Sequence, residues 1–431
     1  MEYTDGASLG EASPHSFAMN DQLPLAGIRV LDLSRVLAGP LCGQILANLG
    51  ADVVKVERPG LGDETRAWGP PFLPPAPGES KPGPSAYYLS INRGKRSLAL
   101  DLARPEAREV VDGLLSKADI LLENFLPETL AKFGLLPERL AALHPQLVRV
   151  SISGYGRTGP LADTPGYDLA IQASSGLMAI TGEADGAPMK VGVAITDVVT
   201  ALYATTAALA GLVRRGRLGA GVGYDLSLAD CTLSALVNVA QASLLTGRAP
   251  QRFGNAHPQI VPYESFATSD GALVVAVGND AQWQRFCAAL DHREWAADPR
   301  FATNPSRVIH REELIPLILA VLKLRSTEEW KARFTAADVP HAPVQSLDQV
   351  FASPQVAARG MLREVTDSAG RSYRAVGSPL ISPELPQAPT QPAPEIGEQS
   401  DEILHEWLGY DPARIAALRS SGVISGPTSQ N

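Results

Sequence analysis

The stretch over residues 27–58, GIRVLDLSRVLAGPLCGQILANLGADVVKVER, predicts the architecture of the first half of the chain. Two β-rich runs, residues 28–33 and 52–57, flank residues 39–49, whose apolar side chains recur at helical spacing and which Gly50 closes. A strand, a helix and a strand in this order predict parallel strands joined by a right-handed crossover. The stretch therefore predicts an α/β fold built on a Rossmann-like parallel sheet.

A dinucleotide site is one interpretation of this stretch, because Gly39 and Gly43 follow the first strand and Glu57 ends the second. The glycine spacing departs from G-x-G-x-x-G. Arg58, directly after Glu57, favours a phosphate over a free ribose hydroxyl. We therefore expect no nicotinamide or other nucleotide cofactor.

The alternation of strands and helices continues to about residue 230. Strands are predicted at 96–101, 120–124, 147–153 and 224–228, with helices at 105–117, 127–133 and 137–143. Residues 59–84 are rich in Pro and Gly and predict a long surface loop. The basic string N-R-G-K-R over residues 92–96 is either a solvated loop or a local patch for an anionic ligand.

The pattern of predicted strands and helices changes near residue 254. A hairpin over residues 263–277 precedes helices at 282–290, 312–323 and 327–337, which predicts a smaller α+β domain. The predicted organisation is a disordered tail (1–23), a large α/β domain (24–230), a connecting helix (231–253), the small domain (254–360) and a C-terminal segment (361–431), which contains a proline-rich linker (379–394).

An apolar run over residues 191–213 is long enough to cross a bilayer, but Asp197 interrupts it. Its Ala and Thr content favours a buried helix of a globular core, with Leu202 on the apolar face and Asp197 at the helix start. The carboxylate is then either a cap for the first turn or a group for chemistry. The partial positive charge of a helix start predicts that it is ionised.

Composition excludes several classes of function. The 431-residue chain has a net charge of -9, which disfavours nucleic acid as a partner. Its three cysteines lie far apart and predict neither a disulfide framework nor a metal site, and the polar N-terminus resembles no signal peptide, so we expect a cytoplasmic protein. No G-x-S-x-G, Walker or H-E-x-x-H motif is present. A carboxylate nucleophile in a glycine-rich cleft remains.

Six motifs together resemble the class III CoA-transferases. They are R-V-L-A-G-P (35–40), V-V-K-V-E-R-P-G-L-G-D (53–63), N-R-G-K-R-S (92–97), E-N-F (123–125), P-G-Y-D (165–168) and the segment that ends in Asp197. The resemblance covers roughly residues 24 to 420. It implies a large Rossmann-like domain, a smaller α+β domain, a C-terminal segment (361–431) that returns to the large domain, and a homodimer whose two subunits interlock.

The resemblance also implies the site. Asp197 matches the family's nucleophile, which attacks an acyl-CoA and becomes an aspartyl-CoA thioester that an acceptor carboxylate then attacks. Tyr167 and Asp168 match a pair that lines the acyl pocket. Coenzyme A is then a substrate, and no metal is needed. The positions that match CoA contacts are Leu37, Ala38, Arg58, Leu100, Asp101, Ala103, Asn124, Phe125 and Lys132, of which Arg58 and Lys132 would meet phosphates.

Departures from the family pattern restrict the substrate. Tyr167 stands where the family's racemases have a proton-transfer histidine, and a phenol with a pKa near 10 is a poor base, so CoA transfer is favoured over racemisation. Leu37 replaces a glutamine of formyl-CoA transferase, which disfavours oxalate and formyl-CoA. His257 is either a contact for the acceptor acid or a plain loop histidine. We expect succinyl-CoA or a similar donor and a small carboxylic or dicarboxylic acid acceptor; a catalytically silent CoA-binding module is the third alternative. We expect no membrane partner.

Overall fold

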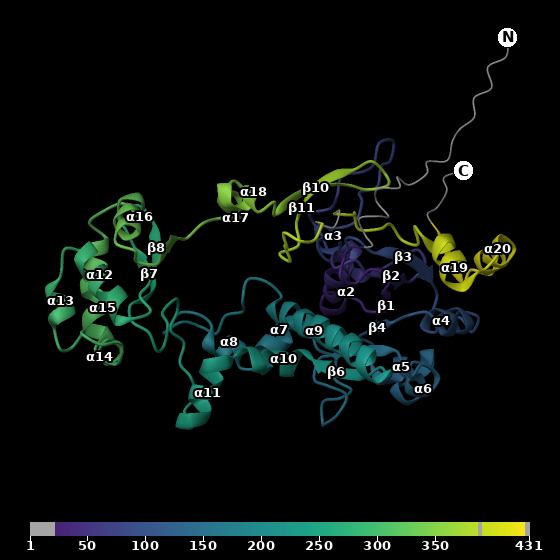
Figure 1. Ribbon diagram of the computed structural model, residues 1–431, viewed down its shortest axis with the longest axis horizontal. Coiled ribbons are helices and arrows are strands. Elements are labelled where there is room, and N and C mark those ends of the chain that lie inside the picture. Colours follow the sequence, from purple (N-terminus) through teal and green to yellow (C-terminus); the bar gives the residue numbers. More distant parts are fainter. Residues whose placement is uncertain (1–21, 387–389, 427–431) are drawn as a thin grey trace, which may run out of the picture. The chain divides into compact units, whose positions relative to one another are not determined.

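The computed structural model describes residues 22–386 and 390–426 of the chain, which form two compact units (Figure 1). The first unit combines residues up to 175, residues 192–236 and residues from 357 onward; the second combines residues 176–191 and 237–356. Most of the predicted tail (1–23) lies outside the described residues, as do residues 387–389 of the predicted linker. The predicted α/β class is confirmed.

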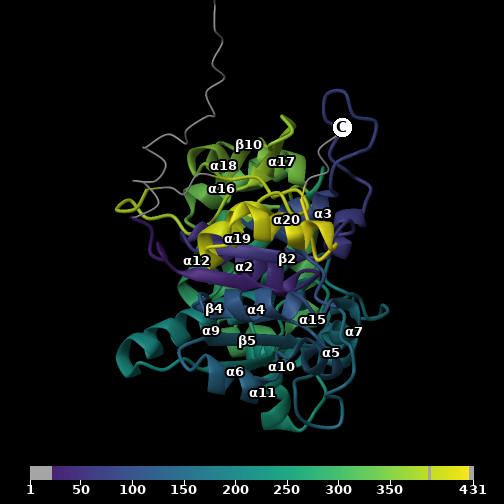
Figure 2. The ribbon, with the colours of Figure 1, turned by 90° about the vertical axis from the view of Figure 1, so that its right-hand side faces the viewer.

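A seven-stranded sheet forms the centre of the first unit, in the order β12-β3-β2-β1-β4-β5-β6. In Figure 2 the labels β2, β4 and β5 follow one another down this sheet. All its strands are parallel except β12, which pairs antiparallel with β3. The strands are β1 (Arg29–Asp32), β2 (Asp52–Glu57), β3 (Arg96–Leu100), β4 (Ile120–Glu123), β5 (Val148–Ser153), β6 (Gly223–Ser227) and β12 (Ile424–Ser425).

Strand order reverses at β1, because β2 lies on one side of it and β4 on the other. In open α/β sheets of this topology, ligands bind beyond the carboxyl ends of the strands at the point of reversal. The loops that follow β1 and β4 therefore define where a site is expected.

Alternate residues of the strands face two separate cores. Val30 and Val53 pack with α2 (Ala38–Asn48), α9 (Ile195–Leu218) and α10 (Leu228–Ala235). Leu31 and Val54 pack with α4 (Ala107–Leu115), α5 (Pro127–Phe133), α6 (Pro137–Leu143), α19 (Ser400–Leu408) and α20 (Pro412–Ser420). Burial on both faces explains why the strands read as nearly continuous apolar runs.

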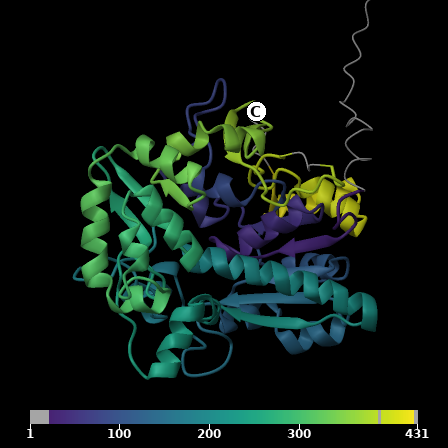
Figure 3. The same ribbon diagram turned by 60° about the vertical axis from the view of Figure 1, so that its left-hand side comes forward.

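Helix α9, in teal in Figure 3, lies along the sheet and is the one helix of the described residues that is by itself long and apolar enough to span a bilayer. It packs on α2 and β5 through small residues. A Cβ atom at Gly211 would lie only 2.4 Å from Val148 Cγ1, so only glycine permits this approach. The prediction that Leu202 lies on the buried face is wrong: it is 54% exposed, because the close helix–sheet contact selects Ala and Thr instead.

The second unit contains the predicted hairpin, β7 (Tyr263–Ala267) and β8 (Ala272–Ala276), together with an unpredicted third strand, β9 (His341–Pro343). Its core is aromatic, with Trp283, Phe286, Trp330 and Phe334 buried. Its helices are α8 (Leu177–Ile180), α11 (Val237–Thr246), α12 (Asp280–Ala289), α13 (Glu294–Ala297), α14 (Asn304–Ile309), α15 (Arg311–Leu322), α16 (Thr327–Ala336) and α17 (Leu347–Phe351).

The remaining elements of the first unit belong to the connections between strands of the sheet or to the C-terminal segment. A hairpin of the C-terminal segment was not predicted from sequence: β10 (Leu362–Thr366) with β11 (Ser372–Val376). The other elements are η1 (Glu64–Ala67), α3 (Ala86–Ile91) and α7 (Asp168–Ser174), and α18 (Pro354–Ala358) crosses the division between the units.

Candidate functional site

The first turns of two crossover helices meet at Asp197. Helix α2 follows β1 and α9 lies between β5 and β6, so both helices begin at the carboxyl edge of the sheet, and they pack against each other. The backbone N–H of Ala38, in the first turn of α2, donates a hydrogen bond to the Asp197 carboxylate. An N–H of a first helical turn has no partner within its helix, so it is available for this contact.

Asp197 is buried but does not cap its own helix. It is the third residue of α9 and is 8% exposed. The free N–H of Thr196 donates instead to Asp168 Oδ1 (2.8 Å), as does the Thr196 hydroxyl (2.7 Å). Asp168 Oδ2 accepts from Gln172 Nε2 (2.6 Å). Of the two alternatives for Asp197, capping is therefore excluded, because Asp168 performs that role.

The environment of Asp197 favours its protonated form. Burial, and then the negative charge of Asp168, raise the pKa of Asp197 from 3.8 to about 7, against the opposing effect of the Ala38 N–H. The prediction that the helix start keeps this carboxylate ionised is therefore wrong: near neutral pH both forms are populated. A strongly perturbed carboxylate at a ligand-binding edge is typical of a functional group.

Tyr87, whose phenol is influenced by the charge of Asp197, and its neighbour Trp68 were not identified from sequence. Burial, and then the negative charges of Asp197 and Asp168, raise the pKa of Tyr87 in α3 to about 12, so its phenol stays protonated and able to donate. Trp68 packs edge-on against the Tyr87 ring, with 5.2 Å between centroids. The sequence offered only S-A-Y-Y after a proline-rich loop, a pattern without a distinctive period.

The basic string over residues 92–96 is neither a solvated loop nor a free anion patch. Lys95 is 5% exposed, and its Nζ lies 2.9 Å from Asp32 Oδ2. Arg93 is 7% exposed and donates to the Val376 carbonyl (2.6 Å). Arg96 pairs with Asp52 (2.6 Å). The string is therefore not a solvated loop, and as an anion patch it is wrong for Lys95 and Arg96, whose charges are paired with carboxylates, while Arg93 is buried against a carbonyl without an acidic partner among the described residues.

Most positions that the resemblance assigns to CoA lie at the ends of strands. Leu100 is the last residue of β3, and the others follow β1 (Leu37, Ala38), β2 (Arg58), β3 (Asp101, Ala103) and β4 (Asn124, Phe125), while Lys132 lies in α5. The side chains of Arg58 and Lys132 are exposed, and neither forms an ion pair within the described residues. They are available to an anionic ligand. Leu37, Leu100 and Phe125 are buried.

Tyr167 and His257, the two remaining predicted substrate contacts besides Asp168, belong to different units of the chain. Tyr167 immediately precedes α7 and is 63% exposed. His257 belongs to the second unit, where its Nδ1 accepts from the Gln259 N–H (3.0 Å). Burial, and then the charge of Arg311, lower the pKa of His257. The imidazole is therefore neutral near pH 7, with Nε2 carrying its proton.

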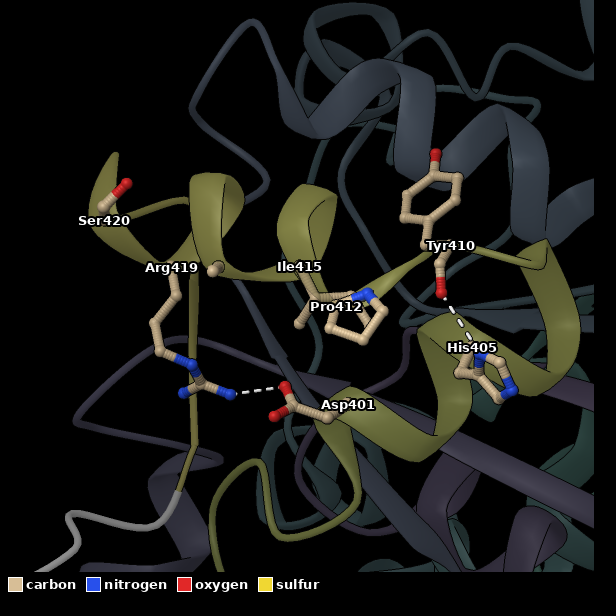
Figure 4. A pocket seen from close by; sticks show the side chains of 8 residues that line it. Asp401, His405, Tyr410, Pro412, Ile415, Arg419 and Ser420 are labelled. Carbon is tan, nitrogen blue, oxygen red and sulfur yellow. Dashed lines mark hydrogen bonds and ion pairs between the residues drawn. The ribbon is translucent and has the colours of Figure 1, made fainter.

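A cavity of 510 Å³ lies between α19 and α20, in the helix layer on the opposite face of the sheet from α9 (Figure 4). Its charged side chains already have partners: Arg419 pairs with Asp401, and His405 Nδ1 contacts the Tyr410 carbonyl (3.1 Å). The described residues contain no cluster of three or more His, Cys, Asp or Glu side chains arranged for a metal ion. The carboxyl edge around Asp197 thus remains the candidate site.

Comparison with known proteins connects this geometry to a family. Residues 25–400 match the model of CoA-transferase family III. Succinate–glutarate CoA-transferase of Agrobacterium fabrum is 45% identical, covering 90% of this chain and 96% of that protein. Human succinyl-CoA:glutarate CoA-transferase is 38% identical, covering 97% and 94%.

A solved structure is similar throughout. The crystal structure of a CAIB/BAIF family protein from Brucella suis superposes with a TM-score of 0.77 at 41% identity, covering 90% of this chain and all of that one. The resemblance drawn from six short motifs is thereby confirmed over nearly the whole described chain. This protein belongs to CoA-transferase family III.

Proposed function

We propose that this enzyme transfers CoA from succinyl-CoA to a small dicarboxylic acid, such as glutarate, with Asp197 as the nucleophile. The observation that carries the proposal is the buried Asp197 carboxylate, which receives the Ala38 N–H at the carboxyl edge of the sheet. Membership of the family and the activities named for the two relatives above support the donor and the acceptor class.

The reaction conserves the energy of the thioester. The ionised Asp197 attacks the thioester carbonyl of succinyl-CoA, which expels CoA thiolate and leaves a mixed anhydride. The thiolate attacks the Asp197 acyl carbon, which releases succinate and leaves an aspartyl-CoA thioester. The acceptor carboxylate attacks this thioester, and the thiolate released a second time attacks the acceptor acyl carbon. The product is the new acyl-CoA, and Asp197 is regenerated.

The described residues supply what these steps require. The Ala38 N–H lies where it stabilises negative charge on an oxygen of the Asp197 acyl group, as an oxyanion-hole donor does. The protonated phenol of Tyr87 adds a second donor near the same carboxyl group. Exposed Arg58 and Lys132 are suited to the CoA phosphates, which is how a chain of net charge -9 holds a polyanion.

We also propose a cytoplasmic homodimer. The three cysteines are buried and unpaired, which suits a reducing compartment. Helix α11 has no buried residue, and its Leu244 and Leu245 are 79% and 78% exposed, so a second subunit covering them is consistent with the family's interlocked dimer. Sedimentation that yields a monomer at all concentrations would contradict this assembly.

A panel of acceptor acids tests the proposed activity. The purified enzyme is incubated with succinyl-CoA and each acid, and acyl-CoA products are identified by mass spectrometry. We expect glutaryl-CoA or another dicarboxylic acyl-CoA, with stoichiometric succinate. Incubation in heavy water addresses racemisation: exchange of an α-hydrogen without transfer to any acceptor would replace this proposal with an acyl-CoA racemase.

A further inference from the structure

The turn between β1 and α2 contains a strained residue. Val36 has a φ of +72°, in the left-handed region, which a β-branched side chain strongly disfavours. Such a conformation persists only where surrounding contacts impose it, and it is common at functional sites. Two residues later, Ala38 donates its N–H to Asp197. Whatever holds Val36 in place therefore sets the direction of that N–H.

Side chains of two strands hold the first residue of this turn. The Ser34 N–H donates to Asp32 Oδ1 (3.0 Å), at the end of β1. The Ser34 carbonyl accepts from Lys55 Nζ (2.8 Å), in β2. Lys55 is 0% exposed, and its Nζ also pairs with buried Asp63 (2.9 Å), so it has no access to a bound substrate.

A third side chain holds the next residue. Asn124, directly after β4, accepts from the Arg35 N–H (3.0 Å) and donates to the Arg35 carbonyl (2.8 Å), as an adjacent strand would. All four backbone polar groups immediately before Val36 are thus bound by side chains from three different strands or strand ends. Among the residues that the structure describes, no backbone group takes part.

The start of α2 is in close contact with this turn. A Cβ atom at Gly39 would lie 2.2 Å from Ser34 Oγ, so glycine is required there. A displacement of Ser34 or Arg35 is therefore transmitted to Ala38, the residue before Gly39.

We propose that Asn124 and Lys55 are positioning residues for CoA transfer, which clamp the Val36 turn so that the Ala38 N–H stays fixed on the Asp197 carboxyl group. This inference rests on the proposed function of Asp197. Asn124 then holds the turn whether or not it also contacts CoA. Lys55 is buried and affects turnover only by holding the same turn.

The test combines Asn124→Ala with Val36→Gly. Asn124→Ala removes both bonds to Arg35, and we expect kcat to fall by roughly 10- to 100-fold, the cost of a small misplacement of a catalytic group. The acidic limb of the pH profile should move to higher pH, because the displaced N–H no longer lowers the pKa of Asp197. Adding Val36→Gly to Asn124→Ala should restore part of kcat, because glycine adopts a positive φ without a clamp.

Asn279→Ala is the matched control. It removes another asparagine bond to a backbone N–H, that of Gln282 at the start of α12 in the second unit. We expect it to lower thermal stability without moving the pH profile. If Asn124→Ala does not fold, Asn124→Asp, which keeps the acceptor for Arg35 and loses the donor, is measured in its place with the same expected direction.

Two results would overturn the inference. One is a higher KM for acyl-CoA with unchanged kcat and pH profile, which would make Asn124 a CoA contact only. The other is a loss of kcat that Val36→Gly leaves unrepaired. Infrared titration measures the pKa of Asp197 directly and needs no turnover, with Asp197→Asn as the reference that identifies its carboxyl band. Wild type and Asn124→Ala are compared, and Asp168 and Tyr87 are present in both. A chain without transferase activity would defeat the proposed function, while this titration still decides the positioning role.

Discussion

Asp32 and Asp197 are both buried carboxylates at the carboxyl edge of the parallel strands of one sheet, yet the charges next to them have opposite signs. Asp32 is 0% exposed and lies 2.9 Å from Lys95 Nζ. Burial alone raises its pKa, but the charges of Lys95 and Lys55 bring it below the ordinary value. Asp197 has a like charge, Asp168, as its neighbour, and burial and that charge raise its pKa to about 7.

The difference separates a paired, structural carboxylate from the one that we propose as the nucleophile. Paired and hydrogen-bonded, Asp32 is held ionised and anchors Ser34. Asp197 lies in an environment that disfavours its negative charge, and in the proposed mechanism that charge is removed when the carboxylate forms a mixed anhydride with an acyl group. Both side chains are buried, so it is the difference between their neighbouring charges that leads us to propose Asp197, and not Asp32, as the reacting carboxylate.

Asp197→Asn should have the largest effect on activity. An amide is a poor nucleophile, so we expect kcat/KM for CoA transfer to fall by at least about 10³-fold. Asp230→Asn, in the first turn of neighbouring α10, is the matched control and should retain activity. Steady-state transfer assays on both variants provide the measurement. Transfer by Asp197→Asn within tenfold of wild type would remove Asp197 from the mechanism.

Asp32→Asn should instead damage stability. The change leaves the Lys95 ammonium buried without its counter-ion, which typically costs about 3–5 kcal/mol. Urea unfolding followed by tryptophan fluorescence measures the loss. A midpoint equal to that of wild type would show that the ion pair of Asp32 and Lys95 contributes no net stability, and the proposed contrast with Asp197 would fail.

Stability should depend on pH in opposite ways at the two carboxylates. Asp197 ionises near pH 3.8 in the unfolded chain and near pH 7 in the folded one, so the folded chain binds more protons between these values and loses stability as pH rises. At about 1.36 kcal/mol per pKa unit, the loss is at most about 4 kcal/mol. Asp197→Asn should therefore be more stable than wild type at pH 8 and no more stable at pH 4, by calorimetry. A variant less stable at pH 8 contradicts the raised pKa.

Asp168→Asn should have the smallest of these effects. It removes the like charge beside Asp197 while keeping an oxygen for the Thr196 N–H and hydroxyl. The pKa of Asp197 should fall, so the acidic limb of kcat/KM should move down by about one pH unit. Initial rates between pH 5 and 9 measure this limb. An unchanged or upward-moving limb would mean that burial alone sets the pKa of Asp197.

Local patterns were sufficient to predict most of the fold. The strands near residues 28–33, 52–57 and 120–124 were recognised because they are apolar runs between turn signals, and β1, β2 and β4 occupy them. The two-residue strand β12 and the short strand β9 carry no such pattern, since pairing with a distant strand creates them. These elements depend on tertiary contacts alone.

The site was predictable from sequence only where a local pattern marked one of its residues. Asp197 stood out as a charge inside an apolar run. Three features could not be predicted, because they depend on side chains from other elements: the raised pKa of Asp197, the acceptance of the Thr196 N–H by Asp168, and the hydrogen bonds of Asn124 to Arg35, next to Val36. The basic string over residues 92–96 misled the prediction, because its partners Asp32 and Asp52 belong to strands far away in sequence.

Mapping the covalent intermediate tests the role of Asp197 most directly. The enzyme is mixed with succinyl-CoA without an acceptor, quenched with acid, digested with trypsin and analysed by mass spectrometry, with hydroxylamine added to a parallel sample. We predict CoA on the peptide over residues 191–214, converted to a hydroxamate at Asp197 by hydroxylamine and absent from Asp197→Asn. Transfer at the full rate with the adduct on another peptide, or with no adduct at all, would contradict the role assigned to Asp197.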